Sequence, residues 1–497
     1  MTLFLQRDSK VFLEKTVGSQ TQYWEIPVLE GFSFSQGNET TETVLSEMAD
    51  DNGLTRRGRR MFNDALSPAE WSFSTYIRPF KSAGSGTGKA DATGAHHLIE
   101  EALWANFVGD GGWMTSTSGV ATVDTPSGGA SGAAGVYEID QLEYTTDSAS
   151  GSGATFRITH GGGVIDETAV TIVNPGSGYV VNDTFTIPKE SIGDASSDFT
   201  FDVATLTSGA GAAYDYELEN IVHGTSSSAI YFTGSNQAEL GTFALYFVLG
   251  AQNAATANNY TAAEISDGKI KIYKIANCVV NEATINFDVD GIAMIDWSGN
   301  GTEITAYTSA LDMTAASGSD AGVVTEDITA TDNFIRNKLT ALTATAANTS
   351  VFDGAGSGVY NFTLTGGSIT FSNNITFLTP EELGTVNTPI GHITGNKSIS
   401  GNFTCYISAG LAGDSADFYA DMVSTAAKAI ITNSFDLTFK LGGSSGTPRF
   451  EINLPTTHIE IPTVNIEDVI AVDMSFHGIP SSIEAADEAT LTIVGAA

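Results

Sequence analysis

Four strand-like segments of this 497-residue chain occur twice, in the same order. The paired segments are 31–35 with 367–372, 71–77 with 401–407, 243–250 with 435–442, and 292–299 with 470–478. In the second pair apolar residues alternate with polar ones, which is the pattern of a half-buried β-strand. The repeat also preserves the side of the strand on which each residue lies, since Tyr76 and Tyr406 are each on the side opposite the apolar residues of their segment. Tandem copies of one plan predict two similar β domains. They favour a protein that builds a structure from repeated units over one that performs chemistry in a single cleft.

A helix candidate follows each copy of the second segment. Residues 96–108 and 415–426 carry apolar residues four positions apart, which is a helical spacing. Ser415 is the predicted N-cap of the later helix. The resulting β-β-α-β-β order predicts a small sandwich or barrel with one helix at its side. Only 16% of the residues are charged, and this composition favours a mainly β fold with many turns.

The segment between the two halves of the first copy differs in composition. It is dense in Gly, Ser, Thr, Ala and Asp, and short strand-like runs alternate with turn signals. We expect a small all-β domain inserted into a loop, in a peripheral position. The predicted divisions are a discontinuous first domain (1–115 and 213–310), the insert (116–212), a linker (311–332) and a second domain (333–497).

The charge of the chain is one-sided. Against 58 acidic residues there are 21 Lys and Arg, giving a net charge of −37. Such a surface repels polyanions, which argues against binding of nucleic acid through neutralised phosphates but not against passage of DNA without binding. Acidity suited to a salty habitat, or to solubility alone, is the other interpretation of this charge.

The sequence predicts neither secretion nor a disulfide framework. Cys278 and Cys405 are the only cysteines and lie in strand-like runs, so we expect two buried thiols. No basic, apolar leader follows Met1, and the apolar runs are shorter than a membrane span. We expect a soluble protein that folds in a cytoplasm and has no contact with a membrane.

Two clusters resemble metal sites, and neither is expected to bind a metal. Residues 286–291 imitate the start of a calcium loop, but Trp297 stands where the last ligand should be. Their alternation instead predicts a strand that shows Asp288 and Asp290 to solvent. His96 and His97, with Glu100 and Glu101, are predicted to form a solvated helix start, because adjacent histidines point to different faces of a helix. We expect no catalytic residues, no cofactor and no metal.

Residues 56–60 form the only basic cluster of the sequence. Contact with nucleic acid is one interpretation. The other is ion pairing with carboxylates of the same chain or of a neighbouring subunit. We favour the subunit interface, because planar guanidinium groups suit ion pairs there.

Several segments resemble tail tube proteins of tailed bacteriophages. The resemblance covers both copies of the repeat but not residues 116–212. In the first copy it rests on residues 27–35, 40–47, 56–60, 68–79, 277–293 and 297–299, and in the second on 368–374 and 389–398.

The resemblance implies a fold and an assembly. It implies β-sandwich domains, each with one flanking helix, whose inner sheets join across subunits into a ring. Stacked rings would form a tube that guides double-stranded DNA, in a structural rather than enzymatic role. The loops between the first two strands, 36–70 and about 373–400, would contact neighbouring subunits and rings. The implied interface residues are Glu39, Glu42, Glu47, Arg56, Arg57, Arg59, Arg60, Glu381, Glu382 and Lys397.

A channel for DNA would need a repulsive lining, and we expect Asp288 and Asp290 to belong to it. If both copies join the ring, three chains form a trimer with pseudo-sixfold symmetry, which we favour. If only the first copy joins, six chains form a hexamer. The other expected partners are tail proteins: the tape measure, the terminator, a baseplate or tip, and a sheath where one is present.

Two other functions compete with the tube. A virion decoration or adhesin on the tail surface is the first, and a polysaccharide hydrolase is the second. Among 58 acidic residues chance carboxylate pairs are inevitable, and no constellation singles out an active site.

Overall fold

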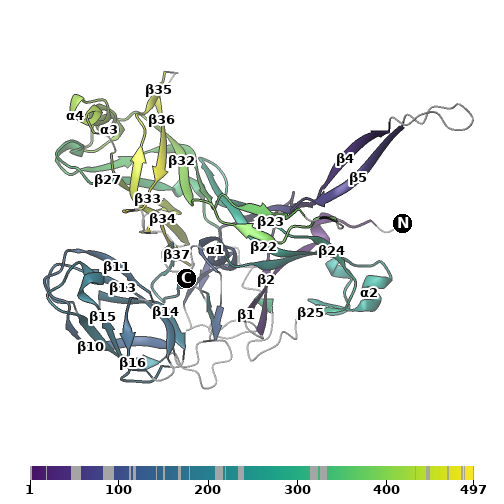
Figure 1. Cartoon of the computed structure of the whole chain (residues 1–497). Coiled ribbons are helices and arrows are strands. Elements are labelled where there is room, and N and C mark those ends of the chain that lie inside the picture. The colour runs from purple at the N-terminus through teal and green to yellow at the C-terminus, as the bar shows by residue number, and fades with distance from the viewer. Residues whose placement is uncertain are drawn as a thin grey trace, which may run out of the picture.

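The structure is a computed structural model of the whole chain. It describes residues 3–495 apart from 18–19, 46–57, 82–94, 111–112, 116–118, 141–142, 149–150, 166–168, 178, 207–215, 219, 233–239, 314–322, 325–332, 382, 384–385, 431–432, 444–447, 467–468, 483–484 and 486. The fold is mainly β, as the sequence predicted, with a few short helices (Figure 1).

Seven strands of the first part of the chain form one continuous hydrogen-bonded series, which we call the N-terminal ladder. Its order is β2 (Gln20–Ile26), β1 (Lys10–Val17), β20 (Phe243–Leu249), β22 (Lys271–Asp288), β23 (Met294–Gly301), β6 (Ala69–Tyr76) and β3 (Ser33–Ser35). All of these pairs are antiparallel. A further strand, β24 (Ile304–Tyr307), pairs with the first part of β22.

Seven strands of the last part form a C-terminal ladder with the same plan. Its order is β28 (Val359–Phe362), β27 (Ala341–Ala346), β33 (Phe435–Leu441), β34 (Arg449–Ile459), β36 (Ala471–Gly478), β32 (Ser398–Tyr406) and β29 (Leu364–Ser372). β37 (Thr490–Val494) pairs with the first part of β34, as β24 does with β22. Even the bulge opposite Phe243 recurs opposite Phe435. The four repeated sequence segments therefore occupy equivalent strands.

The long strand β22 links the two ladders. Its first part pairs with β20, and from Val279 onward it pairs with β23. Asn277, at φ 48, marks the bend between these parts. Its last residues also pair with β29, from Glu282 opposite Ser372 to Asp288 opposite Gly366. One sheet therefore runs without interruption from the N-terminal into the C-terminal ladder.

Two β-hairpins project from this sheet, and we call them the arms. The first arm is β4 (Asn38–Leu45) with β5 (Gly58–Leu66), and the second is β30 (Thr376–Leu378) with β31 (Gly391–Ile393). The first arm reaches far from the body (Figure 1). The base of the first arm meets the loop that joins β30 to β31, where the Leu66 amide donates to the Asn387 carbonyl at 2.8 Å. Parts of the segments expected to be loops, 36–70 and about 373–400, are thus paired strands.

The helix α1 (Glu101–Val108) lies between the ladders rather than outside them. All eight of its residues are buried. The Trp104 ring contacts Trp297 of the N-terminal ladder, with centroids 5.0 Å apart, and Phe371 of the C-terminal ladder, at 5.4 Å. A single hydrophobic core consequently includes residues of both ladders. The helix therefore lies beside both ladders at once.

The second predicted helix is shorter than expected. It divides into α3 (Ser415–Met422) and α4 (Thr425–Lys428). The N-cap of α3 is Asp414, whose carboxylate accepts from the amides of Ala416 and Asp417, each at 3.2 Å. Ser415 is instead buried and donates to the Tyr406 carbonyl at 2.7 Å.

The equivalent strands β20 and β33 differ because their outer faces have different surroundings. β20 is apolar at every position and buried on both faces. A small cluster that includes Tyr260 and Ile265 of the α2 region (Ala262–Ser266) covers its outer face. The outer face of β33 has no such layer among the described residues, and its sequence alternates apolar and polar residues.

Residues 120–206 form two further sheets around a separate hydrophobic cluster, at the lower left of Figure 1. The first sheet has the order β10 (Val120–Gly128), β16 (Phe199–Leu206), β15 (Thr184–Ile187), β12 (Thr145–Thr146). The second has the order β11 (Gly135–Ile139), β13 (Ser152–His160), β14 (Val170–Ser177).

The remaining short strands connect these parts. They are β7 (Pro79–Lys81) with β8 (His96–Leu98), β9 (Trp113–Thr115) with β17 (Tyr216–Leu218), β18 (Ile221–Val222) with β19 (Ser228–Tyr231), β21 (Asn259–Tyr260) with β25 (Leu311–Asp312), β26 (Val323–Val324) on β2, and β35 (Thr463–Asn465) on β36. Two of them, β25 and β26, fall within the predicted linker and pair with strands that precede it.

Replacing Trp104 with Ala should lower the free energy of unfolding by about 3–5 kcal/mol, because the ring is fully buried between the two ladders. Urea denaturation of the unassembled subunit measures this change. Phe62→Ala, on the exposed first arm, is the control and should change it by less than about 0.5 kcal/mol. A Trp104→Ala loss as small as the control's would contradict the shared core.

Candidate functional site

The continuous sheet has one exposed face, which we call the polar face. It is formed by β3, β6, β23, the part of β22 from Glu282 onward, β29, β32, β36 and β35. Buried apolar residues alternate on these strands with Ser, Thr, Asn and a few acids. No Lys or Arg occurs in these strand segments. The described part of this face is therefore hydroxyl-rich and negative.

An aspartate is held in the same way in each half of the polar face. Asp296 accepts from the Ser74 hydroxyl at 2.5 Å and from the Asn286 side-chain amide at 2.9 Å. In the C-terminal ladder Asp473 accepts from the Thr404 hydroxyl at 2.6 Å and from the side chain of Asn465.

Both aspartates are exposed, and their strands pair in the same register. Thr284 lies opposite Asp296, and Thr463 lies opposite Asp473. The repeat thus reproduces a fixed carboxylate together with its two donors. Sequence comparison of the copies does not align this pair, because Asp296 lies three residues before Gly299 and Asp473 lies five residues before Gly478.

The two acids predicted to face a channel have different positions. Asp288 is exposed at the end of β22, on the polar face with Thr284 and Asn286. Asp290 lies beyond the strand, in the bend that precedes β23. The strand pattern expected for this segment therefore ends at Asp288.

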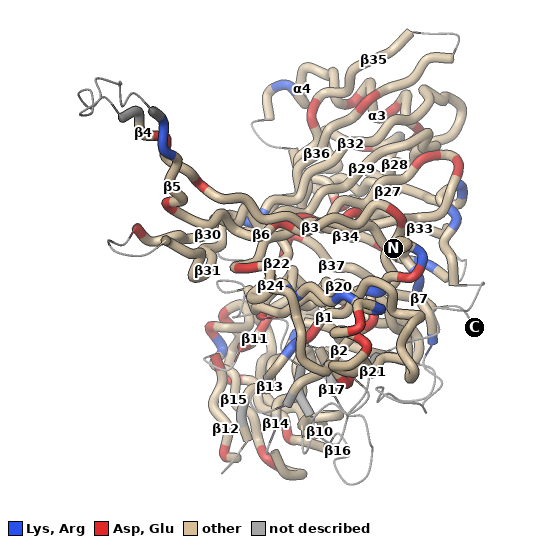
Figure 2. Tube along the Cα trace, turned by 90° about the vertical axis from the view of Figure 1, so that its right-hand side faces the viewer, with Lys and Arg blue, Asp and Glu red and all other residues tan. Residues whose placement is uncertain are grey.

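The predicted interface residues fall mostly on the arms. Glu39 and Glu42 lie on β4, and Arg59 and Arg60 lie on β5 (Figure 2). Arg59 pairs with Glu42 of the same hairpin at 3.1 Å, and both side chains are exposed. Glu381 is exposed just after β30. Four other members of this set lie outside the described residues: Glu47, Arg56, Arg57 and Glu382.

The arms also carry exposed apolar residues. On the first arm Met61 and Phe62 are 68% and 53% exposed. On and beside the second arm the exposed residues are Leu378, Leu383, Val386, Ile390 and Ile393. Large apolar side chains concentrated on projecting hairpins are typical of surfaces that contact another protein.

Lys397, the tenth predicted interface residue, is turned into the chain. Its ammonium group donates to the Val108 carbonyl at the end of α1, at 3.1 Å, and lies over the rings of Phe107 and Phe232. Burial lowers the pKa of Lys397 to about 8, and Glu488 offsets part of this effect. An ion pair with a neighbouring subunit is the wrong role for this side chain, which instead caps α1 from the C-terminal ladder.

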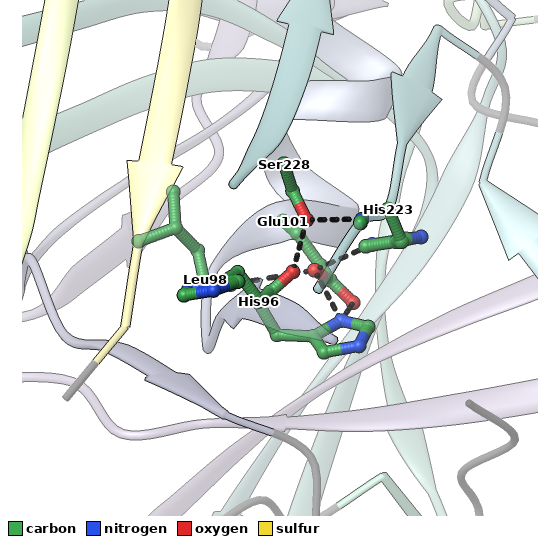
Figure 3. Close-up of polar contacts among 7 residues, drawn as sticks. His96, Leu98, Glu101, His223 and Ser228 are labelled. Carbon is green, nitrogen blue, oxygen red and sulfur yellow. Dashed lines mark hydrogen bonds and ion pairs between the residues drawn. The ribbon is translucent and has the colours of Figure 1, made fainter. Parts of the chain in front are cut away.

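The histidines and glutamates at 96–101 are buried, so the predicted solvated helix start is wrong. Figure 3 shows the polar contacts around His96 and Glu101. The residues before α1 form β8 instead of a first helical turn. His96 accepts from the Gly495 amide at 2.6 Å, and its carbonyl accepts from Ser228 at 2.6 Å. This segment is thereby enclosed by the chain terminus and by the loop before β19.

Glu101 lies between two imidazole rings. His97 Nδ1 is 3.1 and 3.0 Å from the two carboxylate oxygens, and His223 Nε2 is 3.2 Å from one of them. Burial raises the pKa of Glu101, but the two histidines outweigh it and hold the pKa well below the usual value. For the neighbouring Glu100, burial raises the pKa to about 8. His223 could not be predicted as a partner of Glu101, because 122 positions separate the two residues in the sequence.

The rest of the described chain offers no reactive thiol. Cys278 and Cys405 are buried, as predicted, and burial raises the pKa of each. Within the residues described, no helix is long and apolar enough to cross a membrane.

The stability of the subunit should rise between about pH 8 and pH 10 because of Lys397. Its folded pKa lies below that of an unfolded lysine, so in this window the unfolded state binds more protons. Below pH 8 the cost of burying the charge is fully present. Urea denaturation at successive pH values should show a slope of at most about 1.4 kcal/mol per pH unit.

Lys397→Met should remove this contribution to the slope. Lys428→Met, at an exposed position in α4, should retain it. An unchanged slope in Lys397→Met would exclude the lysine as its source.

Comparison with known proteins agrees with this architecture. No protein-family model matches the chain. The chain is 25% identical over 496 residues to the tail tube protein pb6 of Escherichia phage T5. The aligned region covers 99% of this chain and 76% of that protein. The resemblance found in the sequence is thereby confirmed: the chain is related to the tail tube proteins of bacteriophages.

Proposed function

We propose that this chain assembles as stacked rings into a phage tail tube, with the polar face lining a channel for genome delivery. The role is structural, and the subunit acts by self-association and by contact with other tail proteins. The virion tail is its location, after assembly in the cytoplasm of the host. The relationship to the phage T5 tail tube protein supports this function.

The observation that carries the proposal is the junction between the ladders. β22 pairs with β29 inside one chain. The strand equivalent to this part of β22 is β35, since Thr284-Ile285-Asn286 and Thr463-Val464-Asn465 lie in the same register against their aspartate strands. The strand equivalent to β29 is β3, since each is the last strand of its ladder and pairs with one of the equivalent strands β32 and β6.

These equivalent strands leave complementary edges. Among the described residues β35 pairs only with β36, and β3 only with β6. An unpaired strand edge is a template for another chain. We infer that β35 of one chain pairs with β3 of the next, which repeats the β22–β29 junction between subunits. Three chains, each with two copies, would then close a ring of six similar units.

The domain divisions follow from the same argument. We propose residues 1–115 and 213–310 as the first tube domain and 333–497 as the second, joined by 311–332. Residues 116–212 would form a peripheral insert, and the separate hydrophobic cluster of residues 120–206 supports this.

The polar face suits the lining of a DNA channel. Its exposed carboxylates include Asp288, Asp296 and Asp473, and its strand segments carry no cation. Negative charge without cations repels phosphates, so DNA slides without being held. We propose Asp296 and Asp473 as lining acids in addition to Asp288. Asp290 has a weaker claim, because it lies outside the strand.

The arms are the proposed contacts between subunits and rings. Their exposed apolar residues would be buried on assembly, and Glu39, Glu42, Arg59, Arg60 and Glu381 would surround these contacts with charge. Glu47, Arg56, Arg57 and Glu382 belong to the same segments and remain part of the proposal.

Electron microscopy of the purified protein tests the assembly. The wild type should form long hollow tubes with threefold features in each ring. Phe62→Asp should fold but not assemble, because it places a charge in an arm contact. The matched control Val164→Asp replaces an apolar residue that is 82% exposed away from the arms and should assemble. Discrete particles, or strict sixfold rings, would contradict the trimeric tube.

A second experiment tests the lining. The double variant Asp296→Lys, Asp473→Lys should form tubes that retain short DNA duplexes at low salt and release them as salt rises. Wild-type tubes, and tubes of the exposed control Asp267→Lys, should retain much less. Equal retention by all three would exclude the polar face as the channel wall.

A further inference from the structure

We propose that His97, Glu101 and His223 form a binding site for one divalent zinc ion, which fastens the interior of the subunit. The three side chains come from β8, from the first position of α1, and from the loop between β18 and β19. Two imidazoles and one carboxylate are a donor set that suits zinc.

The donor atoms are already close to the spacing that a metal requires. Glu101 Oε2 lies 3.0 Å from His97 Nδ1 and 3.2 Å from His223 Nε2. Bonds of about 2.0–2.1 Å in a tetrahedron place neighbouring donors roughly 3.4 Å apart. The three donor atoms all lie within 4.8 Å of one another. Small movements of the two rings would therefore bring all three donors onto one ion.

The carboxylate can supply more than one donor. Its second oxygen lies 3.1 Å from His97 Nδ1, so both oxygens face the same ring nitrogen. Bidentate coordination by Glu101, together with the two imidazoles, would provide four donor atoms. The rings themselves are stacked, with centroids 4.2 Å apart and planes inclined by 30°, so they approach the carboxylate from neighbouring directions.

The surroundings favour a cation at this position. The side chains of His97, Glu101 and His223 are only 5–6% exposed. Glu100, the residue before Glu101, is fully buried as well. A carboxylate such as Glu101 is expensive to hold without water unless positive charge balances it. A divalent ion would supply that charge.

The position of the site in the fold gives the ion a structural role. β8 and α1 lie on one side of it, and the loop that carries His223 leads into β19, which pairs with the C-terminal strand β37. His96, next to the site, accepts from the Gly495 amide. A metal here would link α1 to β8 and to the loop that leads into β19, and so to the strand that pairs with the C-terminal strand β37.

Zinc binding by the unassembled full-length chain tests the proposal. After treatment with a chelator, the protein should take up one Zn²⁺ per chain, measured by elemental analysis and by competition with a chromophoric chelator. Co²⁺ in its place should give the visible absorption of a tetrahedral site. The melting temperature should rise with zinc concentration, because the ion binds only the folded chain.

Two variants remove donors, and one matched control does not. His223→Ala and Glu101→Gln should each weaken zinc binding by more than the roughly 10- to 100-fold that loss of an outer-shell partner costs. His477→Ala is the control, because His477 and Glu460 form an exposed pair 3.4 Å apart that belongs to no close group of three such donors among the described residues. It should bind zinc like the wild type.

Circular dichroism establishes that each variant is folded, and His97→Gln replaces any variant that is not. Failure of the wild-type chain to bind zinc, or equal binding by wild type and folded donor variants, would overturn the proposal. The cluster would then be a hydrogen-bonded histidine–carboxylate network alone. Tube formation is not part of this measurement, so its outcome is independent of the proposed assembly.

Discussion

The path of β22 determines how the rest of the molecule is arranged. This 18-residue strand pairs with β20 and β24 through its first part, and with β23 and β29 through its last. Its bend at Asn277 passes it from one sheet of the sandwich to the other. Because both edges of its last part are occupied, the N-terminal and C-terminal ladders cannot separate without breaking a central row of backbone hydrogen bonds.

The helix α1 is stable where it lies because residues of both ladders pack around it. Eight residues are too few for a stable helix in water, so packing must supply the stability. The polar groups enclosed with it have partners from distant parts of the chain. Asn106 accepts from the Lys15 ammonium at 3.3 Å, and the Phe107 carbonyl accepts from the Asn373 side chain at 2.9 Å.

The repeated strands were predictable because their information is local. Alternation of apolar and polar residues marks each strand, and its recurrence marks the second copy. The arms were not recognised as strands, because both faces of β4 are solvent-exposed and carry mostly polar residues. Without a buried face a strand has no alternation to detect.

The residues of the candidate sites were harder to predict, for a different reason. Burial of His97 and Glu101 depends on His223, on Ser228 and on the C-terminal residues, none of which is near in sequence. Lys397 follows the same logic, since only the fold brings it to α1. The local sequence indicates on which face of a helix end a charged residue lies. It does not indicate which distant segment of the chain packs over that face.

The two arms differ in length although their ladders share one strand order. The first has strands of eight and nine residues, and the second has strands of three. When one polypeptide carries both, a substitution in one arm leaves the other untouched, which a chain with a single copy cannot achieve. Covalent fusion thus allows the two arms to acquire different contacts, for example a distant contact for the long arm and a near contact for the short arm, while the common strand order is kept.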